Sequence, residues 1–349
     1  MLSIGIVGLP NVGKSTLFNT LTKKQVAAEN YPFCTIEPNV GTVEVPDERL
    51  SALAAISQPK KIISALIEFV DIAGLVAGAS QGEGLGNQFL AHIRECDAIC
   101  QVVRDFDNSN IIHVHNQVNP EHDKQVIDLE LILADLATVA KRLDKASKDA
   151  KSGDKKILAY LELIKQVHTH LESEQPVRTL NLSDEDKLAL KDLSLLSAKP
   201  MLFVINSDDT SKPCAANELR LNIKLENEIA SLPTEEQAEY MEALGVSESG
   251  LSKLIRSSYQ LLGLESFFTT GADETRAWTF PTGAKAPEAA GVIHTDFIKG
   301  FIRAEIINWQ DFVTCGSESI ARTKGLLRTE GKDYTMQDGD LCNFLINQN

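Results

Sequence analysis

The sequence predicts an α/β fold that contains an inserted helical hairpin and ends in a small α+β module. Within the first 21 residues, a short apolar run leads into a glycine-containing loop and then into a segment with apolar residues at helical spacing. Two long amphipathic stripes follow in the middle of the chain, and strand-like apolar runs resume after them. We expect a discontinuous α/β domain over residues 1–124 and 200–262, a helical coiled-coil insertion over residues 125–199, and a C-terminal domain over residues 263–349.

Residues 8–16, with the sequence GLPNVGKST, match the pattern G-x-x-x-x-G-K-[ST] and lie between an apolar run and a helical segment. The glycines let the backbone wrap around a phosphate chain with its amide groups pointing inward, and the helix adds the positive end of its dipole. We expect Lys14 to reach the β- and γ-phosphates of a nucleotide and Ser15 to give its hydroxyl to Mg²⁺. The nucleotide-binding residues predicted in this loop are Asn11, Val12, Gly13, Lys14, Ser15 and Thr16.

Composition limits the classes of protein to which the chain can belong. The net charge of −15 and the pI of about 5.0 argue against binding nucleic acid over the whole surface, so any such contact needs a local basic patch. The six cysteines include no C-x-x-C pair, so we expect reduced thiols rather than a zinc ribbon or a redox motif. The N-terminus has no basic region and no apolar run approaches about 18 residues, so we expect a cytoplasmic protein without a signal peptide or membrane span.

The polar stretch from Lys23 to Asn39 is predicted to be a loop. In switch proteins with a phosphate-binding loop, a threonine in this region completes the Mg²⁺ shell when the γ-phosphate is present. Thr35 is the candidate for this role. A threonine in a loop is also a common turn residue, and the phosphate-binding loop at a suitable distance upstream is what favours the metal role.

Strand-like runs over residues 40–45 and 65–70 are followed by Asp71-Ile72-Ala73-Gly74, a D-x-x-G pattern at the carboxyl end of a strand. We expect Asp71 to hold Mg²⁺ through a water molecule and the amide of Gly74 to contact the γ-phosphate during catalysis. The glycine-rich residues 78–86 suit a segment that becomes ordered with nucleotide, although a plain surface loop has the same composition.

Leu75 stands where a water-orienting glutamine commonly follows D-x-x-G. A leucine cannot hydrogen-bond an attacking water, so hydrolysis must be slow or another group must position the water. His113 and His115 are the nearest titratable candidates downstream. On chemistry alone, each is more often a structural or surface histidine than a catalytic one.

The segment from Gln125 onward predicts an antiparallel helical hairpin after a strand over residues 98–104. Two sets of apolar residues at spacings of three and four are separated by a break at residues 152–154. The first set is Val126, Leu129, Leu133, Leu136, Ala140 and Leu143, and the second is Ile157, Tyr160, Ile164, Val167 and Leu171. A further helix is expected from the capping residue Ser183 to about Ala198.

The predicted tip of this hairpin, Lys141–Lys156, contains seven basic and three acidic residues and therefore has a net charge of +4. Such a run is commonly only the solvated face of a helix. In a chain whose total charge is −15, it is also the place where contact with RNA or another polyanion is expected.

The apolar run 200–205 ends in Asn206-Ser207-Asp208-Asp209, at the place where GTPases carry N-K-x-D. Asn206 is the predicted nucleotide-binding residue here. The asparagine and the final aspartate are present but the lysine is missing, so recognition of the base is altered and a preference for guanine is doubtful. A strand over residues 219–223 and a helix over residues 226–232 are expected to follow.

The C-terminal part contains no catalytic pattern and predicts a compact α+β module. A strand is expected over residues 276–280 and a turn over residues 281–284. Phe297, Phe301 and Ile302 mark a helix, and a turn at residues 338–340 precedes a strand over residues 341–346.

These motifs together resemble the YchF or Obg-like ATPase family of P-loop NTPases, and the resemblance covers nearly the whole chain. The segments that carry it are GLPNVGKST at 8–16, YPFCTIEPN at 31–39, FVDIAGLV at 69–76, GEGLGNQFL at 82–90, NIIHV at 110–114 and GKDY at 331–334. The resemblance implies a Ras-like nucleotide domain interrupted by a coiled-coil hairpin, followed by a TGS domain of β-grasp type.

The resemblance also implies a slow Mg²⁺-dependent ATPase that prefers ATP to GTP and associates with the ribosome. His113 would be the catalytic group, Asn11 would be a ligand for K⁺, and the hairpin tip and TGS domain would contact rRNA. The chain departs from the family pattern between Asn206 and Glu226, where it is shorter than expected. A GTP-driven translation or ribosome-assembly factor is the alternative, and a binding module with a vestigial pocket is a third hypothesis.

Overall fold

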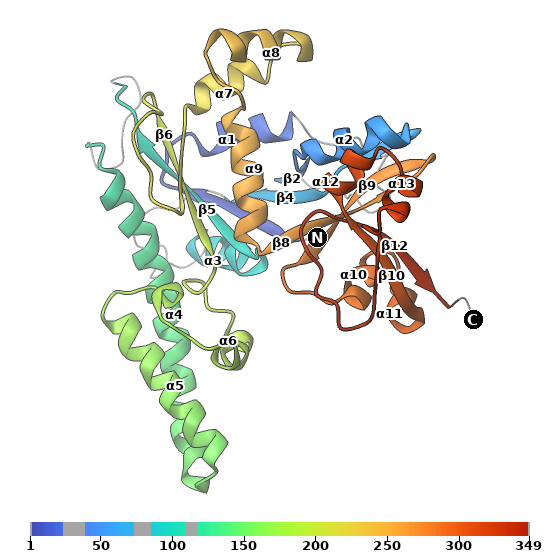
Figure 1. Ribbon diagram of the computed structural model, residues 1–349. Coiled ribbons are helices and arrows are strands. Elements are labelled where there is room, and N and C mark those ends of the chain that lie inside the picture. The colour runs from blue at the N-terminus through green and yellow to red at the C-terminus, as the bar shows by residue number, and fades with distance from the viewer. Residues whose placement is uncertain (1, 24–38, 73–84, 109–116, 348–349) are drawn as a thin grey trace. The chain divides into compact units, whose positions relative to one another are not determined.

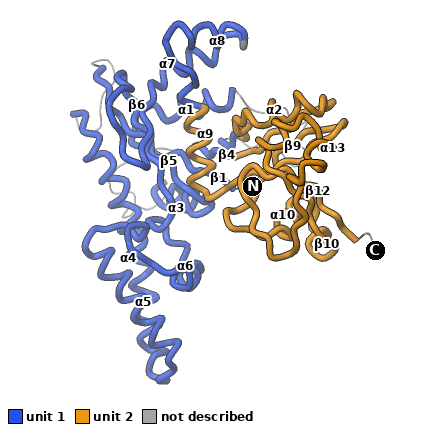
Figure 2. Tube along the Cα trace, viewed as in Figure 1, with its two compact units in different colours: residues 1–41, 68–251 blue, residues 42–67, 252–349 orange. Residues whose placement is uncertain are grey.

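The computed structural model describes residues 2–23, 39–72, 85–108 and 117–347 (Figure 1). Cys34, Thr35, Gly74, Leu75 and His113 therefore lie outside the described residues, as does His115. The chain divides into two compact units, residues 1–41 with 68–251 and residues 42–67 with 252–349 (Figure 2).

A six-stranded sheet with the order β2-β4-β1-β5-β6-β7 forms the core of the first unit, and β2 and β4 run across the division between the units. Strand β1 pairs in parallel with β4 on one side and with β5 on the other. The carboxyl end of β1 is therefore a switch point of the sheet, which is where open α/β sheets bind their ligands. Seven of the eight residues of β5 are buried, as expected for a parallel strand that is covered on both faces. The strands are β1 Ser3–Gly8, β2 Val40–Glu44, β4 Leu66–Asp71, β5 Ala98–Asp105, β6 Met201–Ser207 and β7 Glu218–Leu221.

The helices of this unit, apart from its helical insertion, are α1 Lys14–Thr22, α3 Leu85–Glu95, α7 Ile223–Ile229, α8 Thr234–Ala243 and α9 Gly250–Leu261, the last of which continues into the second unit. Helix α7 begins at the cap Asn222, whose side chain accepts a hydrogen bond from the amide of Leu225. Glu226 on α7 in turn accepts hydrogen bonds from the amides of Gly250 and Leu251, which satisfies free donors at the start of α9.

The predicted helical hairpin is present as α4 Pro120–Asp149 and α5 Lys155–Glu172, which pack against each other. Gly153 takes a φ of 71°, and Asp154 caps α5 by accepting from the amide of Lys156 at 2.7 Å. The predicted face of the first helix is only partly correct. Leu129 is 40% exposed, while Ile132 and Val139 fill the core of the hairpin instead.

The helix predicted from Ser183 to about Ala198 is wrong in its length. Helix α6 spans Asp184–Leu190 and is followed by one turn of 3₁₀-helix. Ser194 then takes a left-handed φ of 45°, which ends the helical run. The buried carboxylate of Asp135 accepts hydrogen bonds from the amides of Leu196 and Ser197, so this segment bonds to α4 rather than to itself.

The second unit contains a mixed six-stranded sheet with the order β11-β10-β12-β8-β9-β3. Its core includes Phe267 and Phe280, which pack against the alanine-rich face of α10. Residues 42–67, which the sequence assigns to the nucleotide domain, supply α2 and β3 to this unit. The elements are α2 Glu48–Ser57, β3 Lys61–Ile63, β8 Leu264–Thr270, β9 Glu274–Pro281, α10 Ala286–Ile293, α11 Asp296–Gly300, β10 Phe301–Asn308, α12 Trp309–Cys315, α13 Glu318–Thr323, β11 Arg328–Glu330 and β12 Asp340–Ile346.

The helix predicted around Phe297, Phe301 and Ile302 is wrong beyond Gly300, where α11 ends and β10 begins. Phe301 is only 3% exposed and belongs to the core under α10, so the apolar residue that suggested a helix is the first inward residue of a strand.

Candidate nucleotide-binding site

The loop between β1 and α1 has the form of an anion-binding site. Gly13 precedes α1 with a φ of 101°, and no side chain caps the first turn of this helix. No acidic residue occupies that turn either, so the amide groups at the helix start remain free to bind a negatively charged group. A cavity of about 400 Å³ lies over the loop, lined by Leu9, Pro10, Asn11, Gly13, Lys14, Ser15 and Thr16.

Lys14 and Asp71, predicted from separate motifs, are brought together in this site. Residue Ile6 of β1 pairs with Asp71 of β4, so the carboxylate lies at the carboxyl end of the strand beside the phosphate-binding loop. The Nζ atom of Lys14 lies 3.3 Å from Oδ1 of Asp71, and the two side chains are 11% and 18% exposed. A cation and a carboxylate held at a helix start are groups that can bind phosphate and Mg²⁺ respectively.

The donor set in the described residues fits Mg²⁺. This ion keeps several water ligands and takes one or two protein oxygens together with phosphate oxygens. Asp71 and the exposed Ser15 offer one carboxylate and one hydroxyl group at this edge of the sheet. Asp71 would hold the ion through water and Ser15 would bind it directly, as the sequence predicts.

Asn206 braces the phosphate-binding loop from the neighbouring strand. Its Nδ2 atom donates to the carbonyl oxygen of Val12 at 2.9 Å, and its Oδ1 atom accepts from the amide of Ile223 at 3.2 Å. The side chain is only 8% exposed, and a Cβ atom added at Gly13 would lie 2.7 Å from Nδ2. The residue predicted to bind the nucleotide thus joins the phosphate-binding loop to the start of α7.

Asp209 bonds to its own loop in this structure. Its Oδ1 atom accepts hydrogen bonds from the hydroxyl of Ser211 at 2.6 Å and from the amide of Ser211 at 3.0 Å. The hydroxyl bond is the larger of the effects that lower the pKa of this carboxyl group. Asp209, the aspartate that would pair with guanine, therefore already accepts two hydrogen bonds within its own turn.

Sequence reasoning did not identify Asp105, the last residue of β5. Its Oδ2 atom accepts from the hydroxyl of Ser207 at 3.3 Å, forms an ion pair with Arg220 and lies 3.8 Å from Nζ of Lys212. The available signal was an aspartate at the carboxyl end of an apolar run, which is the same signal that identified Asp71.

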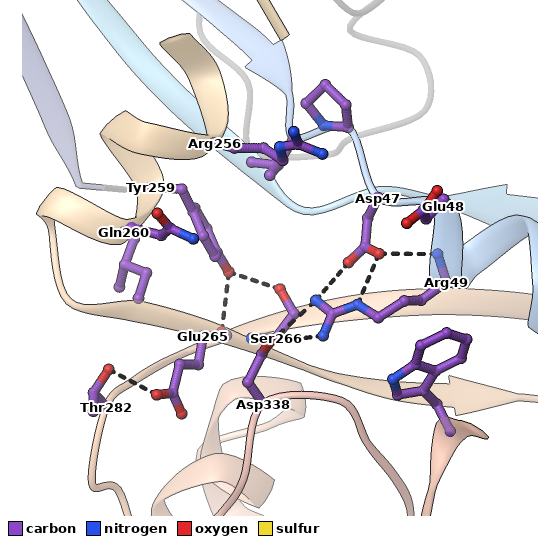
Figure 3. A pocket seen from close by; sticks show the side chains of 14 residues that line it. Asp47, Glu48, Arg49, Arg256, Tyr259, Gln260, Glu265, Ser266, Thr282 and Asp338 are labelled. Atoms are coloured by element: carbon purple, nitrogen blue, oxygen red, sulfur yellow. Dashed lines mark hydrogen bonds and ion pairs between the residues drawn. The ribbon is translucent and has the colours of Figure 1, made fainter. Parts of the chain in front are cut away.

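A larger cavity, of about 570 Å³, lies within the second unit and has a different character (Figure 3). Arg49 forms ion pairs with Asp47 at 2.8 Å and with Asp338 at 2.7 Å, so its charge is neutralised inside the protein. The hydroxyl of buried Tyr259 lies 3.0 Å from that of Ser266, and burial raises the pKa of the tyrosine. These groups satisfy one another, and we assign them the structural role of tying α2 and α9 to β8.

Comparison with known proteins identifies the family. The chain is 49% identical to the ribosome-binding ATPase YchF of Bacillus subtilis (strain 168) over 363 residues, which covers 99% of both chains. It is 51% identical to the ribosome-binding ATPase YchF of Escherichia coli O157:H7, with 98% of both chains covered. The chain belongs to the YchF family.

The solved structure of the Schizosaccharomyces pombe YchF GTPase matches with a TM-score of 0.88 at 37% identity, and covers 99% of this chain and 97% of that one. A family model described as a 50S ribosome-binding GTPase matches residues 3–135, and the model of the YchF GTPase C-terminal part, described as a protein of unknown function, matches residues 264–347. These matches confirm the predicted family and the predicted α/β fold class. Among the helices in the described residues, none combines the length and apolar character needed to cross a membrane.

Proposed function

We propose that this YchF-family chain is a Mg²⁺-dependent ATPase that hydrolyses ATP slowly and associates with the ribosome. The cavity over the uncapped start of α1, lined by Lys14 whose ammonium pairs with Asp71, is the observation that carries the nucleotide-binding part of this proposal. The names of the relatives, which are called ribosome-binding ATPases, support the choice of ATP and of the ribosome. We expect this activity in the cytoplasm.

In the proposed mechanism, the amide groups of the phosphate-binding loop and the ammonium of Lys14 bind the β- and γ-phosphates. Bound Mg²⁺ would neutralise charge that develops on the phosphate oxygens. Asn206 keeps the loop in its binding conformation through its bond to Val12. Thr35, Gly74 and His113 keep their predicted roles as metal ligand, γ-phosphate contact and catalytic group, and Asn11 keeps that of K⁺ ligand.

The proposal that hydrolysis is slow depends on Leu75, whose side chain cannot hydrogen-bond water. A turnover assay on the parent and on a His113→Ala variant tests this point. We expect measurable ATP hydrolysis in the parent and a large loss in the variant. Equal turnover would remove His113 from the mechanism, and no turnover in the parent would favour a binding module.

Calorimetric titration with Mg²⁺ and ATP tests the binding site. We expect the parent to bind and Lys14→Ala to lose binding. Lys187→Ala is the matched control, because Lys187 pairs with a single aspartate on the exposed helix α6. Equal binding by the Lys14→Ala variant would show that the site is misplaced.

The alternative is a GTP-driven translation or assembly factor, and the family model described as a 50S ribosome-binding GTPase keeps it open. The two hydrogen bonds that Asp209 accepts within its own turn favour ATP, because they compete with pairing to guanine. Parallel titrations decide between the two. A preference for GTP of tenfold, about 1.4 kcal/mol, would overturn the choice of ATP.

A further inference from the structure

The connection between β6 and β7 is unusually short for two parallel neighbours. Residues 208–217 join the strands, and this described segment contains no helix. A parallel connection commonly takes a dozen or more residues and includes a helix. The loop is instead fixed by the turn at Asp209 and by Glu218, whose carboxylate accepts from the amide of Ala215 at 3.1 Å. It therefore leaves the carboxyl end of β6 and runs back to Glu218, which pairs with Phe203 near the start of that strand.

This short loop contains Lys212, which lies near the position where the base motif lacks its lysine. Ser207 stands where the base motif N-K-x-D has its lysine. The hydroxyl oxygen of Ser207 lies 3.1 Å from the carbonyl oxygen of Asp209 and 3.3 Å from Oδ2 of Asp105, and the ammonium of Lys212 lies 3.8 Å from the same carboxylate oxygen. The charge of Lys212 and the side chain that stands in place of the missing lysine thus both contact one carboxylate oxygen.

Asp105 links the ammonium group of Lys212 to the strand that carries Asn206 of the nucleotide site. Asp105 is paired with Ser207 across β5 and β6, and Ser207 directly follows the residue that binds the phosphate-binding loop. In open α/β sheets, ligands bind outside the carboxyl ends of the strands, which is the edge that Asp105 and Ser207 occupy.

Lys212 is also only loosely held in the structure. Its side chain is 52% exposed, and its carboxylate partner is shared with Arg220, whose side chain is 16% exposed. Asp105 cannot neutralise two cations at once. An ammonium group in this situation can turn to an electron-rich ligand, such as the face of a purine ring.

We infer that Lys212 contacts the purine nucleoside part of the bound nucleotide and takes over the role of the lysine missing at position 207. The inference rests on the proposed nucleotide binding and adds a binding residue to that site. It concerns the base end of the ligand, whereas Lys14 acts on the phosphates.

Titration of Lys212→Met with ATP, ADP and inorganic tripolyphosphate tests this assignment. We expect ATP and ADP to lose affinity by the same factor, about three- to thirtyfold, and tripolyphosphate to be unaffected. Lys212→Arg keeps a cation and should retain most of the affinity. Lys165→Met is the matched control, because Lys165 is 51% exposed and has one glutamate partner at 2.8 Å.

Two results would overturn the inference while leaving the proposed function in place. The first is unchanged affinity of Lys212→Met for ATP and ADP in a protein whose parent binds both. The second is an equal loss for tripolyphosphate, which would make Lys212 a phosphate contact. If the parent binds neither nucleotide, the proposed function fails together with this inference.

Discussion

Asn206 illustrates how a single residue determines the geometry of the phosphate-binding loop. Its side-chain amide bonds to two backbone groups, the carbonyl of Val12 in the phosphate-binding loop and the N–H of Ile223 at the start of α7. Because the side chain is 8% exposed, water cannot easily replace it.

Replacing Asn206 by alanine is therefore expected to weaken ATP binding at least tenfold and to lower the free energy of unfolding by about 1–3 kcal/mol. Calorimetry and urea denaturation measure the two effects. Asn227→Ala is the control, since Asn227 bonds to Thr20 and Lys23 away from the loop. ATP affinity equal to that of the parent would contradict the bracing role.

Glu218 provides a second prediction at the scale of a residue. Its carboxylate lies 2.5 Å from Nζ of Lys124, and this hydrogen bond lowers the pKa of Glu218 below its usual value of 4.5. The folded state therefore releases its proton more readily than the unfolded state. The stability that the pair adds is present above the unfolded pKa and is lost as the pH falls through the folded pKa.

We expect Glu218→Gln to be less stable than the parent by about 1.5–3 kcal/mol at pH 7, and this difference to shrink as the pH falls below about 4.5. Urea denaturation between pH 7 and pH 3 measures the difference. A constant difference over that range would show that the charge of Glu218 is not what stabilises the pair.

At the scale of a residue, the sequence placed Lys14, Asp71 and Asn206 at or just beyond the carboxyl ends of strands, and in the structure Lys14 contacts Asp71 while Asn206 bonds to Val12. It did not predict that Asn206 would bind Val12, since this depends on the register between distant strands. Lys212 was missed for the same kind of reason. Its position depends on how a loop without regular structure folds back.

At the scale of an element, the helical hairpin shows what periodicity can and cannot predict. Spacings of three and four identified both helices, but they did not identify the buried side of α4. Leu129 is exposed, because α4 carries apolar residues on more than one side and spacing alone does not say which side is buried. Helix α6 ends early, and after the left-handed residue Ser194 the amide of Leu196 bonds to Asp135, 61 residues away, instead of continuing a helix. Such long-range bonds leave no local pattern in the sequence.

The tip of the hairpin carries the proposed contact with rRNA. Lys148, Lys151 and Lys155 are exposed there. We expect the triple change of these lysines to glutamate to reduce co-sedimentation with ribosomes several-fold, and more strongly at low salt, because attraction to phosphate groups falls with ionic strength. Lys165→Glu, on the same helix α5, is the control. An unchanged pellet at low salt would exclude this surface.

At the scale of the whole molecule, all described residues of the proposed nucleotide site belong to the first unit. ATP at 100 times its Kd adds about 2.7 kcal/mol to the stability of the state that binds it. We therefore expect Mg²⁺ and ATP to increase hydrogen-exchange protection within residues 1–41 and 68–251, and to leave the core of the second unit nearly unchanged. Equal protection of β8 and β12 would contradict this expectation.

The division of the molecule was only partly predictable. The sequence predicted an α+β C-terminal module from its turns and strand-like runs, and the second unit contains one. The sequence also assigned α2 and β3 to the nucleotide domain, because they lie between two strands of its sheet. The pairing of β3 with β9, more than 200 residues away, and the packing of α2 against β8 and β9 are properties that no local pattern reports.

This pairing has a consequence for the order in which the protein is made. Strand β3 ends at Ile63, and its neighbour β9 begins at Glu274. At about 5–20 residues per second, translation takes on the order of 10–40 s to cover this distance. During this time, the surfaces of α2 and β3 that pack against β8 and β9 in the finished protein stay exposed to solvent. The nascent chain should therefore depend on chaperones until the last third of the protein has emerged.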